Sequence, residues 1–167
     1  QELAQQFLIY LQDTIQLDGI YADPDLERQN HSAEIGERMI DRVADSLSRI
    51  TWSREDVRRF LGAYLTEPKA HIYFASPDDP LEHEEFVAAC RDQGYRLDAR
   101  SLLLFSGGQF FINGEAVAVP DEDKEIIAAL ADHRHLENLS GLSEETIALL
   151  YDWYCCGFSS PSGSLMP

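Results

Sequence analysis

Basic residues are scarce in this chain: 13 Lys and Arg stand against 30 Asp and Glu among 167 residues, which gives a formal net charge of −17 at pH 7. Affinity for nucleic acid and for anionic membrane surfaces depends chiefly on clustered cations that neutralise phosphates. The composition therefore argues against both kinds of partner. The apolar fraction of 44% is ordinary for a globular protein, so the acidity does not indicate a disordered chain.

Long apolar runs and cysteines are scarce as well. The longest purely apolar stretch covers only residues 126–131, far short of the ~18 residues that cross a bilayer. Residues 1–10 lack the basic start and apolar core of a signal peptide. Three cysteines, Cys90, Cys155 and Cys156, are too few for a disulfide framework. We therefore expect a cytoplasmic protein without disulfides.

Signals that begin a chain are also missing. The first residue is Gln1, and residues 1–17 have helical periodicity with no capping residue in front of them. These two features predict that the sequence is a fragment of a longer protein. A processed terminus is the alternative.

Residues 1–66 are predicted to form three amphipathic helices. Apolar side chains recur at spacings of three and four before Gly19, again after Ser32, and again after Ser53, where Asp56 completes the pattern of a capping box. Three such helices make only a small core, so the apolar stripes either pack within the unit or partly face a second copy. We take as the candidate dimer interface Leu8, Leu11, Ile15, Met39, Val43 and Leu47.

Residues 67–158 mix helices and strands, so the predicted fold class is α+β. We expect a strand at 70–75, a helix from Asp79 and Pro80 to Gly94, and an antiparallel meander over 100–119. Asn113-Gly114 is a strong hairpin signal within that meander. Two helices are expected to follow, one from Asp121 and one from Ser143. Residues 159–167 are rich in Ser, Pro and Gly and are predicted to be a disordered tail.

The order of these elements resembles a known family. Three segments serve as landmarks. The first loop contains Tyr21, Asp23, Pro24, Asp25 and Leu26, and the hairpin turn contains Asn113, Gly114 and Glu115. The aromatic-rich end contains Tyr151, Trp153, Tyr154, Gly157 and Phe158. They resemble the region that follows the catalytic barrel in bacterial ribosomal oxygenases of the JmjC/cupin type. The resemblance covers nearly the whole chain, and none of its landmarks is a catalytic motif.

The resemblance implies a parent enzyme that uses Fe(II) and 2-oxoglutarate to hydroxylate an arginine of a large-subunit ribosomal protein. Residues 1–66 would then be a helical dimerisation region, and residues 67–158 a winged-helix-like domain with a small antiparallel sheet. The implied partners are a second copy of the chain and a basic ribosomal protein. For the chain itself the resemblance implies no catalytic, metal-binding or cofactor-binding residue.

Iron in such oxygenases is held by a His-x-Asp/Glu pair and a distant second His. Only His83 and His135 are followed two positions later by an acid, Glu85 and Glu137. The first pair falls on a predicted helix, where side chains two residues apart point about 200° away from each other. The second pair falls in a link between helices. Both are therefore interpreted as exposed polar groups.

A zinc site is the other metal interpretation we considered. His133 and His135 would have to meet Cys155 and Cys156, and that spacing matches no standard zinc module. We prefer a helix-end turn and two small apolar residues.

Two other classes of function remain open. Acidic runs at 78–85 and 121–125 are interpreted as the starts of helices, but they would also suit an acidic protein-interaction module. A dimeric winged-helix regulator would use residues 143–154 as its recognition helix. That segment has Glu144, Glu145 and Asp152 and no Lys or Arg, and residues 67–167 have 18 acids and 6 bases, a net charge of −12. Insertion into a DNA groove needs the opposite sign.

Overall fold

The computed structural model describes residues 2–14 and 33–163. Contacts divide the chain into two compact units, residues 1–60 and 61–167, with the boundary inside helix α3 (Arg54–Thr66). We call them the helical unit and the winged-helix unit. No helix in the described part of the chain is long and apolar enough to cross a membrane.

The helical unit contains α1 (Glu2–Thr14), α2 (Glu37–Ser48) and the first half of α3. Its small core is aromatic: the ring of Phe7 lies 5.2 Å from that of Phe60 and 6.1 Å from that of Trp52, centroid to centroid. The predicted start of α3 is confirmed, because the Asp56 amide donates to Ser53 Oγ and the Ser53 amide donates to the Asp56 carboxylate.

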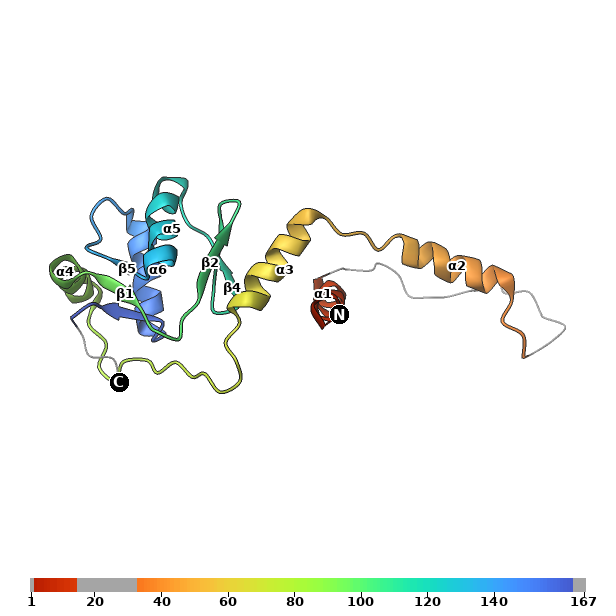
Figure 1. Ribbon diagram of the computed structural model, residues 1–167, viewed down its shortest axis with the longest axis horizontal. Helices are drawn as coiled ribbons and strands as arrows, with labels where there is room; N and C mark the ends of the chain where they lie inside the picture. The colour runs from red at the N-terminus through yellow and green to blue at the C-terminus, as the bar shows by residue number, and fades with distance from the viewer. Residues whose placement is uncertain (1, 15–32, 164–167) are drawn as a thin grey trace. The chain divides into compact units, whose positions relative to one another are not determined.

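The winged-helix unit contains helices α4 (His83–Gln93), α5 (Lys124–His133) and α6 (Glu144–Cys155), and the 3-10 turn η1 (Asp121–Asp123) (Figure 1). The meander predicted over 100–119 is confirmed as the sheet β2-β3-β4, made of Leu103–Ser106, Gln109–Ile112 and Glu115–Val117. A second antiparallel sheet has the order β5-β1-β6, made of His135–Leu136, Tyr95–Leu97 and Ser159–Pro161.

The second half of α3 packs on the sheet β2-β3-β4 through its smallest residue. A Cβ on Gly62 would overlap the ring of Phe111, so glycine is what lets the helix approach the strand so closely. One turn later, Thr66 Oγ1 accepts a hydrogen bond from the Gly114 amide at 2.9 Å and donates to the Gly62 carbonyl. These contacts anchor the hairpin turn between β3 and β4 to the end of α3.

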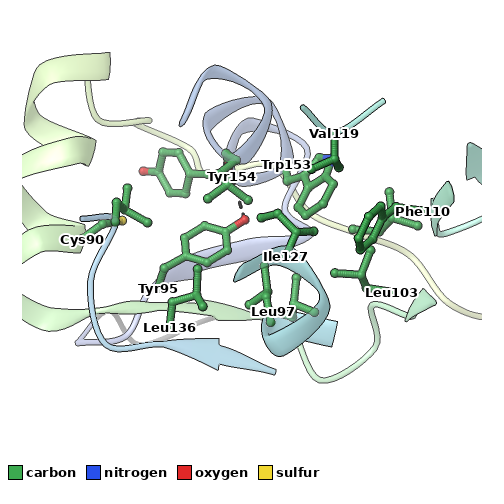
Figure 2. Packing of buried hydrophobic residues seen from close by; sticks show 14 of the residues in the cluster. Cys90, Tyr95, Leu97, Leu103, Phe110, Val119, Ile127, Leu136, Trp153 and Tyr154 are labelled. Carbon is green, nitrogen blue, oxygen red and sulfur yellow. Dashed lines mark hydrogen bonds between the residues drawn. The ribbon is translucent and has the colours of Figure 1, made fainter. Parts of the chain in front are cut away.

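The main hydrophobic core lies between the two sheets and helices α4, α5 and α6. Figure 2 shows Tyr95 from β1, Ile127 from α5 and Trp153 from α6 pointing into it, with the Tyr95 hydroxyl donating to the Leu150 carbonyl at 3.4 Å. Burial raises the pKa of the Tyr95 hydroxyl and raises that of the Cys90 thiol to about 12. Both groups are therefore neutral core residues at physiological pH.

Three expectations from the sequence are wrong. Residues 70–75 form no strand. Helix α4 begins three residues later than expected, at His83 instead of Pro80, because Glu82 and Glu85 form a reciprocal capping box. The predicted disordered tail begins instead with β6, whose Ser159 and Ser160 are buried beside β1.

Two features of the sequence lie outside the described residues. They are the first landmark of the resemblance, Tyr21–Leu26, and the expected start of the second helix, Ser32.

Gly157, which ends α6, is held in a conformation that few other residues tolerate. Its φ is +75°, and a Cβ there would collide with the Ala75 carbonyl. We expect Gly157→Ala to lower the free energy of unfolding by about 2 kcal/mol or more, since left-handed strain alone costs about 1–2 kcal/mol.

Gly141→Ala is the matched control for this substitution. Its φ is +85°, but the nearest atom to an added Cβ is 4.0 Å away. Urea titration of both variants separates strain from collision. Equal losses in the two variants would contradict a close approach at Ala75.

Candidate interaction surfaces

The six residues of the candidate dimer interface differ in their exposure to solvent. Leu8 on α1 and Met39, Val43 and Leu47 on α2 are exposed, whereas Leu11 is only 4% exposed. Leu11 therefore supports the packing of α1 inside the chain rather than an open surface. Ile15 lies outside the described residues.

The apolar side of α2 lacks a covering element in the part of the chain that the structure describes. No residue of this helix is buried, although Val43 is one turn from both Met39 and Leu47. Val43 is 41% and Leu47 60% exposed. Ile40, which is not among the six predicted interface residues, borders them and is 46% exposed. We name Met39, Ile40, Val43 and Leu47 the α2 stripe. An amphipathic helix normally buries such a stripe against another element.

Helix α6, which a winged-helix regulator was expected to use as its recognition helix, presents acids in its first turn. Ser143 caps it by accepting a hydrogen bond from the Thr146 amide, and the exposed Glu144 and Glu145 fill its first turn. Negative side chains there are stabilised by the helix macrodipole. They would repel the phosphates of a DNA groove.

Asp123 lies beneath the start of α6 and is fully buried. Its carboxylate accepts hydrogen bonds from the Ser143 hydroxyl and the Thr146 hydroxyl, both at 2.5 Å, and from the Ser143 amide at 3.1 Å. Burial acts to raise the pKa of Asp123, but the hydrogen bonds from Ser143 and Thr146 outweigh it, so the pKa lies below its usual value. This role of Asp123 could not be predicted from the sequence, where the acidic run 121–125 indicates only a helix start.

Two arginines brace the chain between β1 and β2. Arg100 Nε donates to Asp98 Oδ1 at 2.8 Å, and Arg134 Nη2 donates to the carbonyls of Asp98 and Ser101. The hydrogen bond from Arg100 lowers the pKa of Asp98, which is 5% exposed. Two of the few cations of this unit are therefore engaged in its own structure.

The residues that the structure describes do not suit a metal ion. They include no group of three or more His, Cys, Asp or Glu side chains arranged to hold one. His83 opens α4 and packs edge-on against Tyr151, whereas His133 ends α5 and His135 lies in β5. Fe(II) therefore has no fitting set of ligands in this part of the chain.

Solved structures of other proteins have a fold similar to that of this chain. Ribosomal oxygenase YcfD from Escherichia coli superposes with a TM-score of 0.70 at 20% identity over 97% of this chain and 46% of that chain. A structure of YcfD in complex with cobalt and 2-oxoglutarate gives a TM-score of 0.68 at 19% identity. The chain thus spans less than half the length of the proteins that it superposes on. No curated protein matches it.

The family model described as ROXA-like winged helix matches residues 46–158, about two thirds of the chain. The match includes α6, the capping network of Asp123 and the sheet β2-β3-β4. The α+β fold with its winged-helix domain, expected from the order of elements, is confirmed. This chain belongs to the ROXA-like winged-helix family.

Proposed function

We propose that this chain is the non-catalytic part of a cytoplasmic ribosomal protein hydroxylase that depends on Fe(II) and 2-oxoglutarate. In this proposal the helical unit joins two copies of the protein, and the winged-helix unit docks a basic protein substrate. The solved relatives are ribosomal oxygenases, and one of them holds cobalt and 2-oxoglutarate. The chemistry would take place outside the residues described, since none of these forms a fitting metal site.

The observation that carries the dimer proposal is the exposed α2 stripe. Four large apolar side chains on one short helix are exposed in the single chain, together with Leu8 and Ile9 on α1. Exposed apolar surface of this kind favours association, and a second copy is the commonest partner that supplies a matching surface. The helical unit is also the less acidic one, with 12 acids and 7 bases over residues 1–66, so two copies repel each other less there.

The winged-helix unit is proposed to bind protein rather than nucleic acid. Its net charge of −12 and the acids at the start of α6 oppose binding to phosphates. We expect a fluorescent DNA duplex to show no change in anisotropy with the full chain at low salt. A salt-sensitive rise in anisotropy would support the winged-helix regulator instead.

The second candidate is an acidic interaction module that takes no part in hydroxylation, and the same net charge of −12 favours it. Joining this chain to the barrel of its own parent protein distinguishes the two candidates. The proposal predicts 2-oxoglutarate turnover for the joined protein and none for the 167 residues alone. Hydroxylation of a ribosomal protein by the isolated chain would contradict the non-catalytic assignment.

A further inference from the structure

We call the sheet β2-β3-β4 the wing. Strand β2 and Leu102, the residue before it, present apolar side chains to solvent. Leu102, Leu104 and Phe105 are 43%, 41% and 44% exposed, and no charged residue occurs between Arg100 and Glu115. A wing that contacts phosphates would need Lys or Arg along this hairpin. The composition of this wing instead fits a contact with apolar side chains of another protein.

Strand β2 is also at the edge of its sheet, and backbone N–H and C=O groups on its outer side have no neighbouring strand among the described residues to bond to. The Asn113 amide donates to the Leu102 carbonyl, so this pair is hydrogen-bonded, and hydrogen-bonded pairs alternate along an antiparallel ladder. The N–H and C=O of Phe105 consequently point away from β3. Exposed edges are usually protected by a charge, a proline or a bulge, and residues 103–106 contain no charged residue and no proline.

The turn between β2 and β3 lies beside the start of α5, where residues 121–125 contain four acids and one lysine. Gly108 in the turn between β2 and β3 lies next to Lys124, since a Cβ on this glycine would be 3.2 Å from Lys124 Nζ. Lys124 is paired with Asp121 at 2.6 Å, and Glu122 and Glu125 beside it are exposed. A partner that reaches the apolar strand would therefore meet uncompensated negative charge within the same unit.

We propose that β2 is a docking edge for an extended segment of a basic protein. Apolar side chains of that segment contact Leu102, Leu104 and Phe105, while its Lys and Arg side chains face Glu122 and Glu125. Extended segments commonly add to exposed sheet edges, where main-chain bonds give affinity and side-chain contacts give specificity. The inference deepens the proposed docking role of the winged-helix unit by naming the surface and the kind of segment that it takes.

The test titrates the full chain with a synthetic peptide of alternating lysine and valine, blocked at both ends, and follows amide shifts by NMR. We expect shifts concentrated at residues 102–109 and binding that weakens as salt is added. Replacing both Leu104 and Phe105 with serine should weaken binding at least about tenfold, as expected for central apolar contacts. The matched control, Leu3→Ser, changes a similarly exposed leucine of the helical unit and should leave binding unchanged.

Several outcomes would overturn this inference. Shifts absent from β2, or equal binding of a lysine–serine peptide, would show that the strand does not recognise apolar segments. Loss of self-association in the Leu104→Ser/Phe105→Ser variant would mean that a second copy occupies the edge. This test is independent of the dimer proposal, because self-association is measured from the mass of the unaltered chain without any peptide.

Discussion

Replacing Asp123 with alanine should lower the free energy of unfolding by about 3 kcal/mol or more. The substitution removes the acceptor of two hydroxyls and one amide at the start of α6, and each buried group left without a partner costs about 1–3 kcal/mol. Such a loss is a large fraction of the ~5–15 kcal/mol that stabilises a typical domain. Urea titration followed by circular dichroism measures it.

Asp121→Ala is the matched control, since this residue belongs to the same turn but is exposed and only pairs with Lys124. A surface pair contributes about 0–1 kcal/mol, so this variant should stay close to the parent chain. If both substitutions cost the same, the buried network would not be what stabilises the start of α6.

The same carboxylate predicts a dependence of stability on pH. Its pKa is lower in the folded chain than in the unfolded chain, so its contribution is fully present above the unfolded value near 3.8 and is lost as pH falls through the folded value. Asp123→Asn should therefore flatten the acid limb of the stability curve. An unchanged acid limb in this variant would contradict the assignment.

Replacing Val43 with glutamate should weaken self-association at least about 100-fold. Each copy would have to bury an unpaired carboxylate in the middle of the α2 stripe, which costs several kcal/mol per interface. Val43 is 41% exposed in the single chain, so the fold of the monomer should tolerate the change. Sedimentation velocity over a range of concentrations measures the effect.

Ser48→Glu adds the same charge to the same helix and is its control. Ser48 is exposed and lies about 140° around the helix from Val43. Its self-association should match that of the parent chain. An equal loss in both variants would show that added charge, rather than the position on the stripe, weakens the pairing.

Local signals in the sequence predicted the wing and several helix starts. Asn113-Gly114 forms the expected turn, with φ of +49° and +96°, because these two residues tolerate the left-handed region better than most. Ser53 and Ser143 cap their helices as expected, because a cap depends on residues only three positions apart. Local chemistry was sufficient for these elements.

The sheet β5-β1-β6 had no comparable signal. Its strands are two or three residues long, and β6 reads Ser-Ser-Pro, a sequence with little preference for strands. They form because Tyr95 pairs with Leu136 on one side and with Pro161 on the other, contacts that are distant in sequence. The hydrogen bond that Asp123 accepts from Ser143, the N-cap of α6 20 residues away, could not be predicted for the same reason.

The most direct test of the proposed role is the mass of the unaltered chain in solution, measured by light scattering from micromolar to submillimolar concentration. The account predicts a mass of twice the 18.9 kDa of the chain at the higher concentrations, which falls only when dilution dissociates the dimer. A mass of 18.9 kDa at every concentration would contradict the proposal that the α2 stripe joins two copies.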